Sequence, residues 1–447
     1  MKWPWSLPAT LLSVGALAAA GTMTSVVVRE TGSHADAPKR AATTATSSAA
    51  PSTPSTAAGA DPLAADIVKQ QAEVRRTPGN YVAWASLGLD YVQQAKITVD
   101  PSYYPKATGV LARSLKINTA GNYVAMAGMA ALKAAEHDFT AARRWALRGL
   151  TINPYNATLY GSLNDADTQL GRYQEALTAA QKMNRLQPGV PAFTRAEYTF
   201  ELRGDLPNAK RALSRALAIA TAPADKAFVY YYLGELDFNN GDPRGSLTQC
   251  DTGLRADPTY AALRQCKARA EAALGRTRAA ISDYTRTVND VPQPQYVVEF
   301  GEYLQSLGRT AQAQQQYQLF ATENKLFEAN GVTLDTDPTL FYANHNNPKL
   351  ALHFGKIGLT IRPFIEMQDA YAWALHANGR NAEALVQVKR AMQLGTRNAL
   401  FYYHAGMIEK ALGNRTKAKA DLRQALAINP YFSPLYAPVA RASLAKL

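Results

Sequence analysis

Prolines recur in this chain at a nearly fixed interval, and this spacing constrains its fold more than any other feature. Successive intervals are 34, 35, 35 and 34 residues for Pro154, Pro188, Pro223, Pro258 and Pro292. The step from Thr396 to Pro430 is again 34 residues. Because proline cannot continue the hydrogen-bond ladder of a helix, each one marks the end of a helix. A period of this length predicts a stack of helical hairpins.

Two further markers keep the same phase. A glycine falls between the two helices of each hairpin, at Gly171, Gly204, Gly241, Gly275, Gly308, Gly379 and Gly413. A small residue follows five positions later, at Ala176, Ala209, Ser246, Ala280, Ala313, Ala384 and Ala418. In the long gap after Gly308, Asn346 stands where a glycine is expected. One hairpin cannot bury both of its apolar faces, so the hairpins must stack on their neighbours.

The first hairpin opens with a recognisable signature, W-x-x-L-G-x-x-Y, formed by Trp84, Leu87, Gly88 and Tyr91. Parts of this signature return at Tyr230, Leu233, Gly234, Tyr402 and Gly406. From about Asn80 to Pro430 the chain resembles the tetratricopeptide-repeat family, in an extracytoplasmic bacterial form. The resemblance implies an all-α, right-handed α-solenoid of about ten helix–turn–helix units. We expect these units to begin near Tyr81, Tyr123, Ala157, Val190, Ala227, Ala261, Pro294, Val332, Ile365 and Ala399.

Irregular places interrupt the solenoid, which we expect over residues 80–430. Eight extra residues in the first unit are assigned to a loop at Ile97–Pro105, and the second helix of unit seven runs on to about Ala329. Unit eight matches most weakly, with Asn344–Asn347 as its turn. Capping helices are expected at Leu63–Arg76, within residues 61–79, and at Leu435–Lys446, within residues 431–447. They would shield the apolar ends of the stack.

The N-terminal segment, residues 1–30, is interpreted as a targeting segment. No charged side chain lies between Lys2 and Arg29, and residues 7–28 are apolar or small. Two interpretations stay open: a signal peptide cleaved after Ala18-x-Ala20, or a retained membrane-anchor helix. Residues 31–60, almost all Ala, Ser, Thr, Pro and Gly, are expected to form a disordered linker. Either interpretation places the body outside the cytoplasm, anchored to the cytoplasmic membrane or secreted.

No pattern of catalytic or metal-binding residues is found. The closest histidine pair, His345 and His353, flanks a helix start at Pro348, which is poor geometry for a shared metal. No phosphate-binding glycine loop and no G-x-S-x-G motif occurs. We therefore expect no enzyme activity, no metal, no cofactor and no nucleic-acid partner.

The two cysteines lie eight residues on either side of Pro258, at Cys250 and Cys266. Residues equidistant from the turn of an antiparallel helix pair lie at the same level, so the two side chains can meet. A disulfide is chemically permitted outside the cytoplasm. The alternative is two small buried core residues that do not bond.

The family resemblance implies that the first helix of each unit lines a concave, partner-binding groove. By phase, the groove residues are Tyr198, Glu201, Phe228, Tyr231, Glu235, Phe238, Gln265, Arg269, Asp369, Trp373, His376, Tyr403 and Lys410. For each aromatic residue among them, packing between helices is the alternative. The predicted function is a non-enzymatic scaffold that binds a protein or peptide there, in a bacterial envelope. The net charge is +13, of which +11 lies beyond the first sixty residues. It supports an alternative, binding of anionic wall polymer or lipid headgroups, which a continuous basic stripe in the groove would favour.

Overall fold

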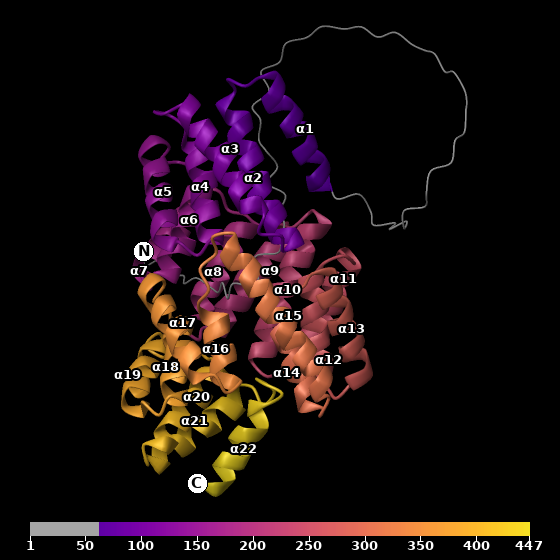
Figure 1. Ribbon diagram of the computed structural model, residues 1–447, viewed down its shortest axis with the longest axis vertical. Helices are drawn as coiled ribbons and strands as arrows, with labels where there is room; N and C mark the ends of the chain where they lie inside the picture. Colours follow the sequence, from indigo (N-terminus) through magenta and orange to yellow (C-terminus); the bar gives the residue numbers. More distant parts are fainter. Residues whose placement is uncertain (1–61) are drawn as a thin grey trace, which may run out of the picture.

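The computed structural model describes residues 62–447, and Figure 1 shows them as stacked helices with no strand in that range. A first helix, α1, spans Pro62–Arg76 and precedes ten helical pairs. The first helices of the pairs are α2 (Tyr81–Thr98), α4 (Tyr123–Ala135), α6 (Ala157–Gln169), α8 (Val190–Glu201), α10 (Pro223–Asn239), α12 (Ala261–Ala273), α14 (Pro294–Ser306), α16 (Thr336–Asn344), α18 (Ile365–Ala377) and α20 (Ala399–Ala411). The second helices are α3 (Tyr103–Ile117), α5 (Phe139–Ile152), α7 (Tyr173–Leu186), α9 (Leu206–Ile219), α11 (Pro243–Ala256), α13 (Thr277–Asp290), α15 (Thr310–Ala329), α17 (Pro348–Ile361), α19 (Asn381–Ala391) and α21 (Arg415–Ile428). A last helix, α22, spans Tyr436–Lys446.

The predicted all-α solenoid of ten units is confirmed, and eight of the ten units begin at the expected residue. Unit five begins at Pro223 rather than Ala227, because proline suits the first position of a helix as well as the end of the preceding one. Unit eight begins at Thr336 rather than Val332, where the Asp335 side chain accepts a hydrogen bond from the Thr336 amide. Residues 1–61, which include the predicted targeting segment and linker, lie outside the described residues.

The extra residues of unit one do not form the expected loop at Ile97–Pro105. They extend α2 to Thr98, and the chain turns over only four residues before α3 begins at Tyr103. Val99 takes a left-handed conformation with φ 56° to end the longer helix. The added residues therefore lengthen α2 to 18 residues instead of forming a long loop. The expected extension of α15 to Ala329 is confirmed.

The turn within each unit requires a left-handed residue, as the glycine spacing predicts. The seven glycines of the repeat have φ between 68° and 82° there. Asn346 takes the same conformation with φ 58°, and His137 does so in unit two with φ 65°. The small residues five positions later are at most 1% exposed. These two features explain how paired helices pack closely around a short turn.

The stack of pairs curves in one direction. Successive first helices pack against one another, for example α2 on α4, α4 on α6 and α16 on α18. Within the described part of the chain, successive second helices make no contact of comparable extent. A ribbon with its first helices closer together must curve toward them. The first helices, here called inner helices, therefore line the concave side, and the second, outer helices form the convex side.

The curved ribbon makes more than one turn, and its second turn packs on the first (Figure 1). The turns inside units two to five contact the segments that join units seven to ten and α22. Gly171 faces the Pro363 carbonyl, Gly204 faces Gly395, and Gly241 faces Ile428. We call this contact the seam. It joins residues about 190 to 200 positions apart, as in the hydrogen bond from Asn429 Nδ2 to the Phe238 carbonyl, 2.9 Å.

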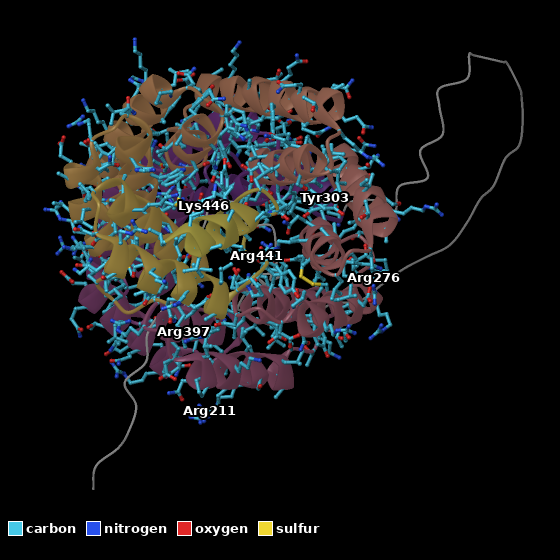
Figure 2. The ribbon with its side chains drawn as sticks, turned by 90° about the horizontal axis from the view of Figure 1, so that it is seen from below. Arg211, Arg276, Tyr303, Arg397, Arg441 and Lys446 are labelled. Carbon is cyan, nitrogen blue, oxygen red and sulfur yellow. A yellow bond between two sulfur atoms is a disulfide. The ribbon has the colours of Figure 1, made fainter. Side chains whose placement is uncertain are left out.

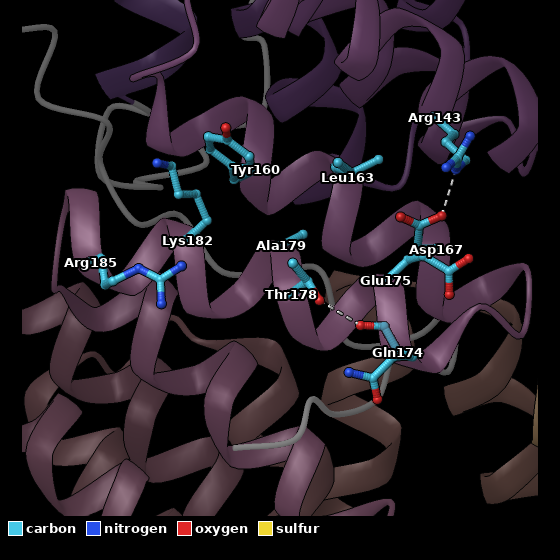
Figure 3. Close-up of a pocket in the computed structure, with 10 residues that line it drawn as sticks. All are labelled: Arg143, Tyr160, Leu163, Asp167, Gln174, Glu175, Thr178, Ala179, Lys182 and Arg185. Carbon is cyan, nitrogen blue, oxygen red and sulfur yellow. Dashed lines mark hydrogen bonds and ion pairs between the residues drawn. The ribbon is translucent and has the colours of Figure 1, made fainter. Parts of the chain in front are cut away.

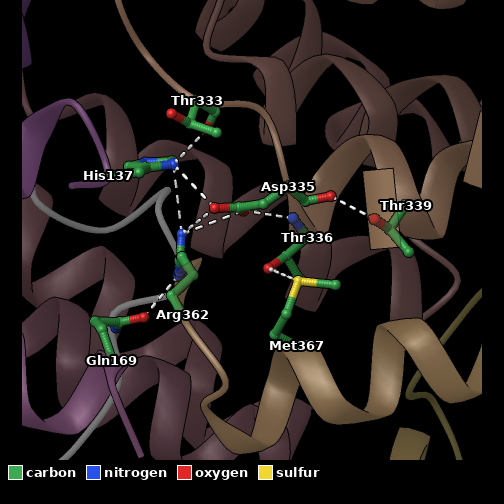
Figure 4. A network of polar contacts seen from close by, with 8 residues as sticks. All are labelled: His137, Gln169, Thr333, Asp335, Thr336, Thr339, Arg362 and Met367. Atoms are coloured by element: carbon green, nitrogen blue, oxygen red, sulfur yellow. Dashed lines mark hydrogen bonds and ion pairs between the residues drawn. The ribbon is translucent and has the colours of Figure 1, made fainter. Parts of the chain in front are cut away.

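A buried ionic network holds the seam at units two and three (Figure 4). The Arg362 side chain is fully buried, and its Nη1 lies 2.9 Å from Asp335 Oδ2. Arg362 Nη2 donates to Gln169 Oε1 at 2.7 Å, and His137 Nδ1 lies 3.2 Å from Asp335 Oδ2. The ring of Phe364 lies 4.3 Å from the guanidinium carbon. Arg362, Asp335 and Phe364 belong to the second turn, whereas His137 and Gln169 belong to the first.

A disulfide joins Cys250 of α11 to Cys266 of α12, with 6.1 Å between the two Cα atoms (Figure 2). It links the outer helix of unit five to the inner helix of unit six. Gly234 of α10 packs directly on both sulfurs, because a Cβ atom there would lie within 2.8 Å of each. The pairing across Pro258 follows the geometry predicted from the sequence.

Candidate binding surface on the inner helices

The position six residues before each turn glycine forms a row along the inner helices. It holds Asp165, Tyr198, Glu235, Arg269, Glu302, Trp373 and Met407. The structure pairs Glu235 of α10 with Arg269 of α12 as a salt bridge. Arg269 Nε also lies 4.0 Å from Glu299 Oε1 on α14. One guanidinium therefore bridges three successive inner helices.

The Glu299 carboxylate is held from two further sides. It accepts a hydrogen bond from the Tyr284 hydroxyl at 2.6 Å and another from the Gln265 amide. Burial raises the pKa of Glu299, although Arg269 and these donors oppose the increase. The guanidinium of Arg269 stacks on the Phe238 ring, 4.5 Å from its centre. These contacts rigidify the middle of the inner surface.

Similar pairs continue along the ribbon. Arg195 Nε on α8 donates to Asp165 Oδ1 on α6 at 2.8 Å. His345, at the end of α16, places Nε2 3.4 Å from Glu302 of α14. Asp369 and His404 meet between α18 and α20 at 2.8 Å. Inner helices are thus joined by an ion pair and by histidine–carboxylate contacts, and they do not present a continuous basic stripe.

Two carboxylates near the seam lack such a partner. Glu201 of α8 and Glu366 of α18 form no salt bridge with any described residue. Burial raises the pKa of each to about 7; the charges of Glu235 and Glu366 add to the increase at Glu201, and the charge of Asp369 adds to it at Glu366. Glu366 Oε1 accepts from the Tyr198 hydroxyl at 3.0 Å, while its Oε2 is buried without a hydrogen bond. Asn239 lies 3.5 Å from Glu201.

The aromatic residues predicted for the groove lie mostly within the walls. Tyr198, Tyr231, Phe238, Trp373 and Tyr403 are at most 7% exposed. Adjacent inner helices approach so closely that rings at these positions fill the space between them. This burial corrects the expectation that they are open to a partner.

The remaining predicted residues divide between packing and polar contacts. Phe228 is partly buried and packs edge-on against the Tyr232 ring, 4.9 Å away. Trp373 Nε1 donates to Asn344 at 2.8 Å. His376 lies 4.8 Å from Trp373 in a stacked arrangement, and burial lowers its pKa. Lys410 donates to Ser443 of α22 at 3.1 Å.

The sequence reasoning missed Asp165, Glu299, Glu302 and Glu366. Asp165 and Glu302 carried a usable signal, since both occupy the row that includes Glu235 and Arg269. Glu366 carried none, because it becomes important only where the second turn meets the first.

An outer cleft lies between α5, α6 and α7 and has a volume of about 390 Å³ (Figure 3). Lys182 and Arg185 line one part, and Asp167 and Glu175 line another. Asp167 is almost fully buried and bonds to Arg143 at 2.6 Å, while its Oδ2 has no hydrogen-bond partner. Burial raises the pKa of Asp167 despite this pairing. The side chains that line this cleft carry charges of both signs, and the cleft is open to solvent. It therefore suits a small polar group.

Exposed basic side chains lie elsewhere. In the view along the long axis, Arg211 and Arg276 lie at the periphery (Figure 2), and Arg397 is also exposed. Within residues 62–447, no group of three or more His, Cys, Asp or Glu side chains is arranged to hold a metal. No described helix combines the length and the apolar character that crossing a membrane requires.

Comparison with known protein families identifies one of the repeat units. A sequence model of the tetratricopeptide repeat matches residues 399–432, which comprise unit ten. No curated protein matches the chain in sequence. The matched unit is one of ten consecutive helical pairs that share its turn conformation and its approximate length. Residues 399–432 therefore match a tetratricopeptide repeat, within an α-solenoid of ten consecutive helical pairs.

Several solved structures are similar in part. A tetratricopeptide repeat protein from Parabacteroides merdae is 17% identical over 57% of this chain and 97% of that one, with a TM-score of 0.33. The Cut9–Hcn1 assembly of the APC/C is 14% identical over 85% and 81%, with a TM-score of 0.43. The human IFIT1 dimer with PPP-AAAA is 14% identical over 81% and 86%, with a TM-score of 0.46.

Proposed function

We propose that this protein is a non-enzymatic scaffold whose concave side binds a partner segment carrying basic residues. Repeat solenoids expose long concave surfaces that suit extended peptides. The observation that carries the proposal is that neither Glu201 nor Glu366 forms a salt bridge with any described residue. A chain of net charge +13 thus keeps uncompensated acids on its inner helices.

A cationic side chain would offset the unfavourable free energy of ionising these buried carboxylates. Their pKa values near 7 mean that the fold disfavours their charged forms. A lysine or arginine placed between them would favour the charged forms and would form charge-assisted hydrogen bonds with them. Glu366 Oε2, which is buried without a hydrogen bond, would gain one if such a donor reached it. Glu235, already paired with Arg269, would add negative potential nearby.

Fluorescence anisotropy with labelled peptides tests this proposal. We expect lysine- and arginine-containing peptides to bind, and matched acidic peptides not to bind. The double variant Glu201→Gln, Glu366→Gln should weaken the interaction at least about tenfold. Binding should strengthen from pH 6 to pH 8, because the carboxylates ionise over this range.

The matched control is Glu175→Gln, Glu383→Gln, which changes two exposed carboxylates on outer helices. It should leave the affinity unchanged. Equal loss in both double variants would show a general charge effect and would refute a specific inner site. Equal binding of acidic and basic peptides would refute the proposed partner chemistry.

We further propose that the body works on the outer side of the cytoplasmic membrane, tethered by residues 7–28 or released after cleavage. The apolar character of this segment in the sequence supports the proposal. Membrane fractionation with an alkaline wash, followed by N-terminal sequencing, distinguishes a retained anchor from a cleaved signal. A chain that stays in the cytoplasmic fraction with its first residues intact would refute both.

A further inference from the structure

The ribbon of hairpins has two different edges. Each unit places its internal turn on one edge and its junction with the next unit on the other, because paired helices run in opposite directions. At the seam, the internal-turn edge of the first superhelical turn meets the junction edge of the second. Two edges therefore stay uncovered, one at each end of the molecule. One consists of the junctions between units in the first superhelical turn, and the other consists of the internal turns of the units in the second superhelical turn.

The best-defined contact of the seam lies at unit five. The Asn429 side chain is 2% exposed and donates through Nδ2 to the Phe238 carbonyl at 2.9 Å. A Cβ atom at Gly241 would lie 2.8 Å from the Ile428 carbonyl oxygen. This turn therefore accepts the junction only because it has a glycine.

The same four-residue sequence occurs at a free junction. Residues 152–155 read Ile-Asn-Pro-Tyr, exactly as residues 428–431 do. Both copies have the same local structure: Asn153 Oδ1 accepts from the Tyr155 amide at 3.2 Å, and Asn429 Oδ1 accepts from the Tyr431 amide at 2.8 Å. Both asparagines end an outer helix.

The two copies differ in what covers them. Asn429 is buried in the seam, whereas Asn153 is partly exposed. Tyr155 is 75% exposed, compared with 41% for Tyr431. The free copy thus presents to solvent a docking element that its twin uses inside the same molecule.

The receptor for this element is also present at the opposite end. Gly413 has φ 82°, close to the 81° of Gly241. Its amide donates to the Lys410 carbonyl at 3.1 Å, just as the Gly241 amide donates to Phe238 at 2.9 Å. No atom lies within 4 Å of a Cβ placed at Gly379 or Gly413. These turns of units nine and ten are therefore uncovered.

We infer that a second copy of this chain docks head to tail, with the Ile152–Tyr155 junction of one copy on the internal turns of units nine and ten of the other. The Asn153 amide would donate to a turn carbonyl, as Asn429 does within the chain. This interface is heterologous, so it leaves one free edge of each kind at the ends of the assembly. Association therefore continues into a filament that extends the superhelix. The inference stands independently of the peptide site proposed above.

Sedimentation velocity of the full chain in mild detergent tests this inference. Between about 1 and 100 µM, the range of weak and moderate interfaces, the mean mass of the wild-type chain should rise with concentration. One variant, Asn153→Asp with Tyr155→Glu, disrupts the junction edge by removing the amide donor and adding two negative charges. The other, Gly379→Asn with Gly413→Asn, fills the turn edge while keeping a residue that tolerates the left-handed conformation. Each variant alone should remain monomeric and should melt close to the wild type.

The decisive arm is an equimolar mixture of the two variants. Each variant keeps one intact edge, so the mixture should form dimers and nothing larger. A mixture that stays monomeric while the wild-type chain associates would place the contact elsewhere and overturn the inference. A wild-type chain that stays monomeric throughout, or an edge variant that still associates, would also overturn it.

Discussion

The glycines of the internal turns form two groups that share a backbone conformation but differ in their surroundings. Gly171, Gly204 and Gly241 lie in the seam, where a carbonyl oxygen of the next superhelical turn stands within 3.1 Å of the Cβ position. Gly275, Gly308, Gly379 and Gly413 have the same left-handed conformation with open space around them. The left-handed backbone conformation favours glycine in both groups. Only in the seam does the absence of a side chain also make room for the second superhelical turn.

The largest expected effect tests what holds the seam at units two and three. Replacing Arg362 with alanine should destabilise the fold by about 3–5 kcal/mol, because Asp335 would remain buried without its partner. Burial would raise the pKa of Asp335, but Arg362 and His137 hold it well below its ordinary value. Urea unfolding at neutral pH measures the difference.

Arg380→Ala is the matched control, since Arg380 forms an exposed salt bridge with Glu383. It should cost no more than about 1 kcal/mol. The double variant Arg362→Met, Asp335→Asn should recover part of the loss, because it removes both charges. Equal losses for Arg362→Ala and Arg380→Ala would mean that the buried network does not hold the seam.

The next effect is a pH dependence of stability to which two carboxylates near the seam contribute. Burial raises the folded pKa of Glu201 and Glu366 to about 7, above the ordinary value of 4.5. Between these values the folded chain binds more protons than the unfolded chain, so stability falls as pH rises from about 5 to 8. Each group contributes up to about 3 kcal/mol to this fall.

Thermal melts of the wild type and of Glu201→Gln, Glu366→Gln across this range provide the measurement. The variant should lose the part of the dependence that these two groups contribute and should melt higher than the wild type at pH 8, whereas Asp90 and Asp421, whose pKa values burial also raises to about 6, still titrate in it. A wild-type melting temperature that is flat from pH 5 to 8 would contradict the burial of these carboxylates.

The smallest effect compares the two groups of glycines directly. Gly379→Ala should cost about 1 kcal/mol, the strain of a left-handed alanine. Gly204→Ala should cost about 1–3 kcal/mol more, because its Cβ would lie 2.8 Å from the Gly395 carbonyl oxygen and the seam would have to open. Urea unfolding of the two variants side by side measures this difference, and equal costs would show that the seam is loose at unit four.

Much of the fold could be predicted because the repeat is a local pattern. Proline ends, turn glycines and small residues each act within one hairpin, so their spacing predicts ten units and eight of the ten starting residues. Pro223 was misjudged because a proline can end one helix or begin the next. The candidate site was less predictable, since phase identifies the inner-helix positions but not which of their side chains become buried. Tyr198 and Tyr403 have groove phase, yet each is 1% exposed.

By itself, the sequence determined the hairpin, its length, its turn and the number of copies, because these depend on backbone conformations and contacts within about 34 residues. It also placed Cys250 and Cys266 opposite each other across a single turn. Only the tertiary structure decided that the ribbon closes on itself after roughly 190 residues. The physical reason is that a small rotation at each interface accumulates over many repeats. That sum brings Glu201 beside Glu366, joins His137 to Arg362 and leaves Tyr155 exposed at the free edge.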